Sequence, residues 1–482
     1  MQSLAPVPSH VVARVDGGID EPLRRYGIEQ LLRLVGFGVR FKSDDSATIY
    51  CGSNPAIGAA AAIWIPPDDA FFLDAGQRPT ISLVDGVCVP HRGPAPASLW
   101  VGNRLSFDVA RATAFWLTLE SERYAAARDG HNRVPAAASL LGTLGLLNRP
   151  PIHAYVQLLA DRLNSEANCG SPLPRWPLGK TFAAALSHDV DAPERSNRVP
   201  LYLKEMVFKN HRPRRHAYWD LCAEIRTRGL ANACIRPPSR RPEWDFGEIC
   251  EIEEACGLRS AFYFAVVPRS LGHLCDTTYD SSRSRYRRLY RRLIEGGWEV
   301  GLQAGYLTSA GRPSLRLQVD RLARFSGHGI AGVRHHYLQL DPVAPMRTLA
   351  THADAGLLYD ATVGFNDDLG FRAGIALPYQ PYDPQRQGAA PLVELPTGIA
   401  DMHMPKQYET VSVEAVAEHL RIVRGLGGLA LLNWHVGNWH FAPAWRDSYC
   451  AACRLLAEDA DVWVATPREV ATWWRQRSEA LQ

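Results

Sequence analysis

The pattern of apolar and polar positions in the first third of the chain predicts an alternation of short strands and helices. The segments 47–52 and 61–66 are short apolar runs of the length expected for strands. The segments 26–37 and 107–127 carry apolar residues at helical spacing, and we expect 107–127 to form one long helix. This part of the chain therefore reads as an α/β domain.

A stretch rich in proline, glycine and serine, 164–180, separates this part from the rest of the sequence. We place a domain boundary there. The prediction is an N-terminal α/β domain at residues 1–175 and a larger domain at residues 176–482.

The larger domain repeats a unit of one apolar strand followed by a helical segment. Strands are expected at 181–191, 260–267, 298–303, 332–337, 392–396, 428–435 and 462–466. Alternating strands and helices indicate a parallel sheet, and roughly seven such units favour a closed barrel. The expected fold class is α/β, with a distorted (β/α)7-type barrel behind the smaller N-terminal α/β domain.

Polar residues gather at the carboxyl ends of several of these strands. They are Ser187, His188, Asp189, Asp191, Gln303, Arg334, His335, His336, Asn433 and His435. In barrels of this kind the carboxyl ends of the strands form the active-site face. We therefore expect these residues to share one site.

The residue types at these strand ends suit hydrolysis. Asp189 and Asp191 are two apart on an extended segment, so both point to one side, where one could bind a cation and the other act as a base. His435 could be a general acid or a ligand, and Arg334 could hold a carboxylate ionised. The alternatives remain open: an acidic turn before Pro193, a buried structural histidine and a surface charge cluster.

Seven segments occur in an order that resembles a known family. They are SHDVDAP, SAFYFAV, WEVGLQAGY, GVRHHYLQLD, LLYDATVGFNDDLGFRAGIALPYQPYD, ELPTGIADMHM and LLNWH. Together they resemble the polysaccharide deacetylases of the NodB-homology, carbohydrate esterase 4 type, over about residues 181–470. The segments FDVARATAFWLTLESERY and DGHNRVPAAASLLGTLGLLNRPPIHAY resemble the N-terminal α/β domain that precedes the barrel in one bacterial branch.

The resemblance implies a NodB-like barrel that removes an N-acetyl or other acyl group from a sugar or polysaccharide. It implies that Asp189 is the base, that Arg334 orients it, and that His435 protonates the leaving amine. Asp191 would bind a divalent metal, which is zinc in most such enzymes and polarises the carbonyl and the attacking water. The expected partner is a carbohydrate: an amino sugar, an oligosaccharide or a polysaccharide.

The second metal-binding motif departs from the family pattern. The expected pair of histidines, four residues apart, falls on Gln303 and Leu307, and neither side chain is a good zinc ligand. His335, His336 or His188 could replace the missing ligands, or the cation could be weakly held. The remaining possibility is a pseudoenzyme, a catalytically inactive deacetylase-like protein that binds carbohydrate.

A segment between the fourth and fifth predicted strands has the composition of a sugar-binding loop, with aromatic rings beside hydrogen-bonding groups. The resemblance places it over the cleft. The alternative is a well-packed loop with capping aspartates. The expected substrate-binding residues are Tyr359, Asp360, Asp368, Arg372, Tyr379 and Gln303.

Composition narrows the classes of partner. The chain has 482 residues, of which 46% are hydrophobic and 21% charged, and its net charge is only +3. Such a balance gives no reason to expect nucleic acid, and the arginines of 283–292 read as the solvated face of a helix. We see no membrane span and no secretory pattern, and the ten scattered cysteines fit a reduced protein, so we expect a cytoplasmic location.

Overall fold

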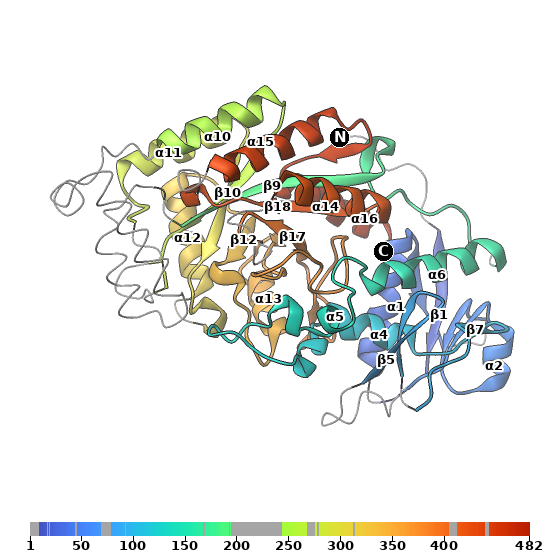
Figure 1. Cartoon of the computed structure of the whole chain (residues 1–482). Coiled ribbons are helices and arrows are strands. Elements are labelled where there is room, and N and C mark those ends of the chain that lie inside the picture. Colours follow the sequence, from blue (N-terminus) through green and yellow to red (C-terminus); the bar gives the residue numbers. More distant parts are fainter. Residues whose placement is uncertain are drawn as a thin grey trace.

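The computed structural model describes most of the chain. The described residues are 9–16, 18, 20–43, 46–68, 79–91, 93–166, 169–191, 193, 243–267, 275–276, 279–311, 314–403, 412–438 and 443–482. Figure 1 shows a larger body that carries the C-terminal strands and helices, and a smaller N-terminal body beside it.

The N-terminal region is built on a six-stranded sheet in the order β2-β1-β3-β4-β8-β7. Its strands are β1 (His10–Val15), β2 (Gly38–Phe41), β3 (Ile49–Cys51), β4 (Ile63–Ile65), β7 (Trp100–Val101) and β8 (Arg104–Leu105). All neighbours pair in parallel except β7 and β8. A separate hairpin joins β5 (Thr80–Val84) to β6 (Val87–His91). The α/β character expected for this region is confirmed.

This sheet is accompanied by α1 (Glu21–Val35), α2 (Pro55–Ala60), α4 (Val109–Leu117) and α6 (Pro151–Glu166). α1 and α4 pack closely because Gly27 has no side chain: a Cβ there would lie 1.9 Å from the carbonyl oxygen of Ala110. A buried ion pair crosses the same contact, with Arg24 Nε 2.8 Å from Asp108 Oδ2.

The helix expected at 107–127 is shorter than predicted. α4 ends at Leu117, Leu119 has a left-handed backbone with φ of 56°, and a 3-10 turn, η1 (Glu120–Tyr124), follows. The interruption turns Glu120 and Glu122 toward arginines of other segments, Arg111 and Arg372. Because Arg372 is 250 residues away from Glu122, helical spacing alone does not predict the break.

The C-terminal region contains the parallel sheet that the strand–helix alternation predicts. Its order is β16-β13-β12-β11-β10-β9-β18-β17, and β19 also pairs with β9. The strands are β9 (Phe182–Val190), β10 (Ser260–Ala265), β11 (Glu299–Ala304), β12 (Gly332–His335), β13 (Tyr359–Asp360), β16 (Val393–Glu394), β17 (Thr397–Ala400), β18 (Leu429–Asn433) and β19 (Val462–Val464).

The sheet curls until its two sides meet. Gly364, just beyond β13, forms a parallel bridge with Thr397 of β17, and the Thr397 amide donates to the Val363 carbonyl at 3.0 Å. The ring therefore runs through β9, β10, β11, β12, β13, β17 and β18. This closure confirms the distorted (β/α)7-type barrel.

The fifth predicted strand, 392–396, takes a different place from the one expected. Its central part forms β16, which pairs with β13, whereas the strand that closes the ring is the next segment, β17. The change from one to the other occurs at Leu395 and Pro396, between the two strands. A proline lacks the amide hydrogen that a continuous strand would use there.

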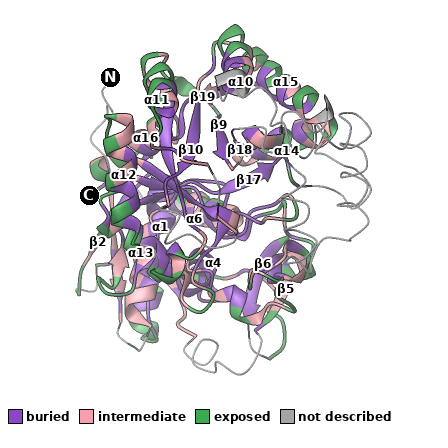
Figure 2. Cartoon of the chain, turned by 90° about the vertical axis from the view of Figure 1, so that its left-hand side faces the viewer, coloured by how far each residue is buried: buried purple, intermediate pink, exposed green. Residues whose placement is uncertain are grey.

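Helices surround the buried strands of the barrel (Figure 2). They are α10 (Glu243–Ala255), α11 (Ser284–Glu295), α12 (Leu315–Ser326), α13 (Pro345–Asp354), α14 (Val413–Leu426), α15 (Pro443–Glu458) and α16 (Pro467–Ala480). All nine residues of β9 are buried, as expected for a strand covered on both faces. In α11 the buried face is Tyr286, Leu289, Tyr290 and Leu293, so its arginines point outward as predicted.

The expected boundary at residue 175 falls between α6 and β9, but the two regions share a continuous apolar core. The C-terminal helix α16 joins them through Arg477, which is fully buried. Its guanidinium donates to the carbonyl oxygens of Arg33 at 2.6 Å, Pro174 at 2.9 Å and Leu173 at 3.3 Å. The Arg33 carbonyl lies in the last turn of α1, where a cation is favourable.

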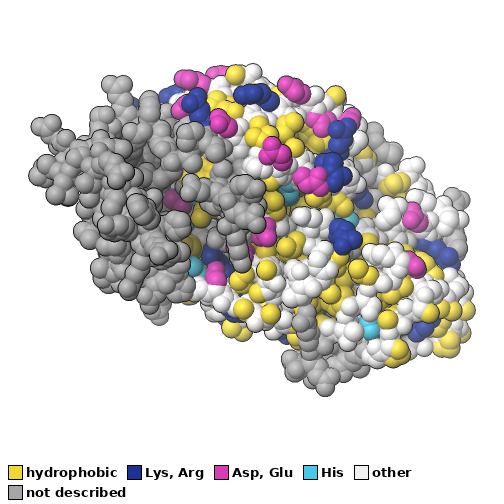
Figure 3. Space-filling model, in the orientation of Figure 1, with side chains coloured by type: hydrophobic (Ala, Val, Ile, Leu, Met, Phe, Trp, Pro, Cys, Tyr) yellow, Lys and Arg dark blue, Asp and Glu magenta, His cyan; other side chains and the backbone are white. Residues whose placement is uncertain are grey.

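Two surface properties bear on the class of partner. On the face that Figure 3 presents, basic and acidic side chains of the described residues are interspersed. Within the described part of the chain, none of the helices combines the length and apolar character that crossing a membrane requires.

Candidate functional site

The end of β9 sends alternate side chains to opposite sides of the barrel wall. His188 packs outward, where its ring contacts Glu253 at 3.0 Å, the Tyr449 hydroxyl at 3.0 Å and the Trp434 carbonyl at 2.9 Å. Asp189 points the other way, into the barrel, and contacts Arg334 of β12. The alternation follows from the period of two along a strand.

Asp189 is held by two neighbours. Arg334 Nη1 donates to Asp189 Oδ1 at 3.0 Å, and Asn433 Nδ2 donates to Oδ2 at 3.2 Å. Arg334 is fully buried and also donates to the Ser187 hydroxyl and the Ala361 carbonyl, each at 3.0 Å. Burial acts to lower the pKa of Arg334, but the adjacent Asp189 carboxylate outweighs it and raises that pKa. Arg334 is therefore a fixed positive charge that orients Asp189.

Asp191, two residues along, lies at the opening and its side chain is about one-third exposed. Gln303 Nε2 of β11 donates to Asp191 Oδ1 at 2.5 Å, and His336 Nε2 lies 3.4 Å from the same oxygen. Burial acts to raise the pKa of Asp191, but the charges of His336 and His435 and the Gln303 hydrogen bond hold it below its usual range. Asp191 is thus a carboxylate between two histidines.

His435, just beyond β18, completes the group from the opposite side of β9. Its Nε2 lies 3.7 Å from Asp189 Oδ2 and 3.9 Å from Asp191 Oδ2. The fully buried Asp401 accepts from the His435 amide at 2.8 Å and contacts its Nδ1 at 2.7 Å. Burial acts to lower the pKa of His435, but Asp401, and then Asp191 and Asp189, raise it to about 10.

The structure therefore brings Asp189, Asp191, Arg334 and His435 together at one mouth of the barrel. A carboxylate fixed by an arginine faces an imidazolium fixed by a second carboxylate. One group can accept a proton and the other can donate one, which is the arrangement that general acid–base catalysis needs.

The donor set fits zinc poorly. Catalytic zinc usually has three protein ligands, whereas Asp191 and His336 contact each other and Gln303 turns its amide nitrogen toward Asp191. His336 Nδ1 faces Asp276 at 3.9 Å. Among the described residues no group of three His, Cys, Asp or Glu side chains could hold a metal ion. The chemistry described below therefore uses the protein's own groups.

His335, the other proposed ligand, contacts a different set of residues. Its Nε2 lies 2.8 Å from His352 Nε2 of α13, and His352 Nδ1 lies 2.9 Å from Asp360 Oδ2. Burial lowers the pKa of His335 to about 3, and the neighbouring His352 acts in the same direction, so the ring is neutral. His335 follows Arg334 on the same strand, so the two side chains face opposite ways.

The proposed substrate-binding residues are dispersed. Tyr359 bonds the Tyr263 hydroxyl at 2.9 Å and Glu299 at 3.0 Å inside the barrel, and Tyr379 is fully buried. Arg372 pairs with Glu122 of the N-terminal region at 2.6 Å. Of this set, Asp368 is exposed on its loop, and Gln303 lies at the barrel mouth.

Three ring-bearing residues at the mouth were not predicted. His131 of the N-terminal region contacts the Tyr306 hydroxyl at 2.9 Å and lies 4.6 Å, ring to ring, from Tyr337. Tyr337 lies at the same distance from His336. Arg133 Nη1 donates to the Tyr337 carbonyl at 2.7 Å and so fixes the loop of His131 against the barrel.

Asp401 was also missed, although its segment was among the motifs that carried the resemblance. A buried aspartate directly after an apolar strand was the available signal. For His131 the sequence offered no comparable signal, because the contact joins residues 175 positions apart.

Comparisons with known proteins give a family model and several solved structures. Residues 19–168 match a family of unknown function (DUF7033). No curated protein matches the chain.

The solved structures to which the chain is similar include three with polysaccharide-deacetylase or carbohydrate esterase 4 descriptions. A protein described as a polysaccharide deacetylase from Mycobacterium smegmatis is 18% identical, with a TM-score of 0.41, and the match covers 63% of this chain and 93% of that one. One so described from Pseudomonas aeruginosa PAO1 is 16% identical, with a TM-score of 0.40 and coverages of 65% and 97%. A mutant of a carbohydrate esterase 4 family pseudoenzyme is 11% identical, with a TM-score of 0.27 and coverages of 64% and 72%.

Identities and TM-scores this low transfer no activity or substrate to this protein. Solved structures described as polysaccharide deacetylases are among those to which the chain is similar.

Proposed function

We propose that this protein is a hydrolase that removes an N-acetyl or other acyl group from a sugar or polysaccharide. The observation that carries the proposal is the pair formed by Asp189 Oδ2 and His435 Nε2, 3.7 Å apart. Each group is held by its own buried partner of opposite charge, so a carboxylate and an imidazolium face each other across the site.

In the proposed reaction, Asp189 accepts a proton from the water that attacks the acyl carbon. Arg334 and Asn433 each donate a hydrogen bond to one of its two oxygens, which fixes the direction of the carboxylate. His435 then donates a proton to the departing amine or alkoxide. Asp401 holds the ring by Nδ1 and leaves Nε2 to face the substrate.

The predicted divalent metal, which is zinc in most enzymes of the resembled family, stays a prediction. Asp191 and His336 are the residues that would contact a cation at this opening, and Gln303 is a weak third partner. Burial acts to lower the pKa of His336, but Asp191 and Asp276 raise it to about 9. The imidazolium of His336 therefore supplies positive charge at the opening from the chain itself.

A carbohydrate substrate is supported by the rings at the opening. His131, Tyr306 and Tyr337 are half-buried, so each retains a part that can contact a sugar face. The proposal makes the N-terminal region part of the substrate site.

One observation favours a second candidate, a non-catalytic carbohydrate-binding protein of the same fold. Gln303 stands where the resemblance places a metal-binding histidine, and ligand loss costs metal affinity heavily. The acid–base pair remains intact, which is why we rank hydrolysis first.

The test is acetate release from N-acetylated oligosaccharides by the full chain, with metal content measured on protein purified without chelator. We expect turnover in the wild type and its loss in Asp189→Asn and His435→Gln. Asp320→Asn, on the exposed face of α12, is the matched control and should retain turnover. Saturable sugar binding without any turnover that depends on Asp189 would establish the second candidate instead.

A further inference from the structure

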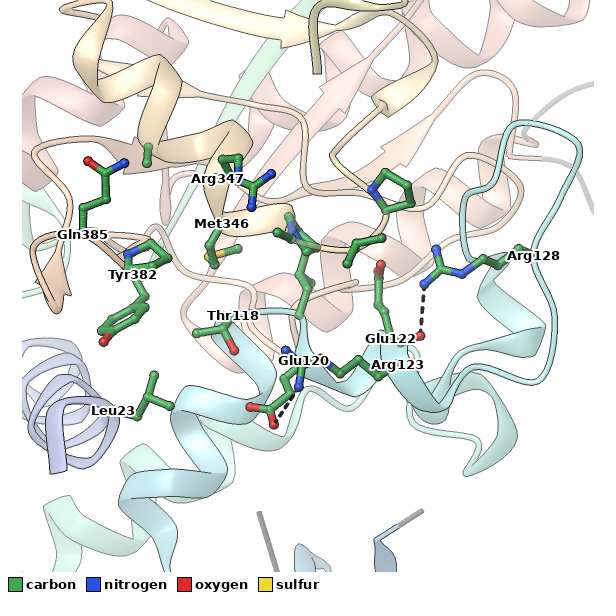
Figure 4. Close-up of a pocket in the computed structure, with 17 residues that line it drawn as sticks. Leu23, Thr118, Glu120, Glu122, Arg123, Arg128, Met346, Arg347, Tyr382 and Gln385 are labelled. Carbon is green, nitrogen blue, oxygen red and sulfur yellow. Dashed lines mark hydrogen bonds and ion pairs between the residues drawn. The ribbon is translucent and has the colours of Figure 1, made fainter. Parts of the chain in front are cut away.

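A cavity of about 430 Å³ lies at the junction of the two regions. One wall comes from the N-terminal region: Leu23 of α1, the end of α4, the turn η1 and Arg128. The second wall is the start of α13 and the segment before it. The third wall is the strand β14 (Tyr382–Asp383) with the turn after it. Figure 4 shows side chains from all three walls surrounding one space. The volume is that of a small-molecule site.

The acidic residues of this cavity are already neutralised from behind. Glu122 accepts from Arg372 Nε at 2.6 Å and Nη2 at 3.1 Å. Glu120 accepts from Arg111 Nη2 at 2.7 Å. Both arginines are buried, so their charges are committed to these carboxylates. The two acids therefore contribute little negative charge to the cavity.

Three further arginines reach the same space with weak partners. Arg123 lies 3.9 Å from Glu120 with 62% of its side chain exposed, and Arg347 lies 3.6 Å from Asp341 with 75% exposed. Arg128 donates to backbone carbonyl oxygens, at 3.0 Å to Asn132 and 3.3 Å to Glu122. None of these contacts is a short ion pair, so the cavity has an excess of positive charge.

The remaining lining is mainly apolar. Met346 and Leu119 are buried in it, and Val343 is 81% exposed at its edge. The ring of Tyr382, which packs edge-on against Tyr26, stands at the opposite end from Arg128 (Figure 4). Arg347 and Met346 belong to the first turn of α13, whose N-terminal end favours an anion.

We propose that this cavity binds a small organic phosphate, with the anionic group between Arg123, Arg128 and Arg347 and the apolar or planar body against Met346 and Tyr382. Guanidinium groups bind phosphate oxygens through paired hydrogen bonds. The ligand contacts both regions of the chain, so its binding holds them together. This site is separate from the proposed hydrolytic centre, since the two share no residue.

The body of the ligand distinguishes two sources: a nucleoside diphosphate, as carried by activated sugars, and a prenyl phosphate, as carried by lipid-linked sugars. Isothermal titration of the full chain with uridine diphosphate and with geranyl phosphate separates them. We expect saturable binding of one probe, weakening as salt is raised.

The variants Arg123→Ala and Arg347→Ala remove exposed side chains, so folding should be retained. Each should weaken binding at least about tenfold, because a hydrogen bond to a charged group is worth that much or more. Arg421→Ala is the matched control, since Arg421 is 72% exposed on α14 and pairs with Glu418. Asp189→Asn should bind the probe like the wild type.

Equal affinity of the double variant Arg123→Ala/Arg347→Ala and the wild type would overturn the proposal. So would failure of both probes to saturate at about 1 mM. Loss of hydrolysis in Asp189→Asn together with unchanged probe binding would show that phosphate binding in this cavity does not depend on the hydrolytic centre.

Discussion

Replacing Asp401 by asparagine is the sharpest test of the proposed acid. Asp401 contacts His435 twice, through the backbone amide at 2.8 Å and through Nδ1 at 2.7 Å. Asparagine keeps the shape and at least one hydrogen bond but removes the charge. The effect on His435 is therefore electrostatic.

The expected size of the change in Asp401→Asn follows from the pKa of His435. His435 lies at about 10, and its distance from the ordinary histidine value corresponds to roughly 5 kcal/mol in favour of the imidazolium. Asp401 is the largest favourable contributor, ahead of Asp191 and Asp189. A hydrogen bond to a charged group is worth about 1.5–3 kcal/mol, so the variant should lower the pKa of His435 by roughly one to two units.

Stability should change with pH in a defined direction. Because the folded-state pKa is raised, His435 stabilises the protein fully below about pH 6.5, and this contribution is lost as the pH rises toward 10. In Asp401→Asn the free energy of unfolding should be lower at pH 7, and the loss with rising pH should be complete at a lower pH than in the wild type.

The assay is an NMR titration of histidine imidazole signals in the full chain, which needs no substrate. His435→Gln identifies the signal, and Asp320→Asn is the control with an exposed carboxylate. If the midpoint of His435 in Asp401→Asn stays within about half a unit of the wild type, Asp401 does not set its charge and the reasoning fails.

Three other variants probe other parts of the molecule. Arg334→Met removes the buried guanidinium partner of Asp189 and should cost about 3–5 kcal/mol in urea unfolding at pH 7. His419→Phe should flatten the acid side of the stability curve: burial and His403 lower the pKa of His419 to about 3, so below about pH 6.5 it costs the wild type up to ~1.4 kcal/mol per pH unit. Arg133→Ala removes the hydrogen bond to the Tyr337 carbonyl and should speed hydrogen exchange in both loops severalfold.

Controls separate these effects from general damage. Arg316→Met removes an exposed arginine paired with Asp320 and should change the free energy of unfolding by less than about 0.5 kcal/mol. An Arg334→Met protein as stable as this control would contradict the buried ion pair. An unchanged slope between pH 7 and 5 in His419→Phe, or unchanged exchange in Arg133→Ala, would contradict the respective assignment.

The grouping of the site residues at the strand ends could be predicted from the sequence because two simple rules of strand geometry determine it. The carboxyl ends of parallel strands meet on one face, which brings Asp189, Arg334 and His435 together. Side chains alternate along a strand, so the same rule sends His188 and His335 to the other side. His336 contacts Asp191 because the 3-10 turn η5 (His336–Leu338) ends the alternation after β12.

What escaped prediction depends on contacts between distant segments. The long helix expected at 107–127 breaks where Glu122 meets Arg372, 250 residues away. His131 reaches the barrel mouth only because the N-terminal region docks there. The spacing of residues within one segment does not indicate such distant pairs. Neither the break in the helix nor the position of His131 at the barrel mouth could therefore be derived from the sequence.

The position of Arg477 bears on how the protein can be divided. The guanidinium has three backbone carbonyl oxygens as its partners, one on α1 and two on the segment that leads to the barrel, and it lies over the Trp474 ring. Cutting the chain at residue 175 would separate that cation from all three acceptors and remove one positive charge from the last turn of α1. We therefore expect that neither fragment alone keeps the structure it has in the intact chain. Complementation between the two separately expressed fragments should depend on Arg477.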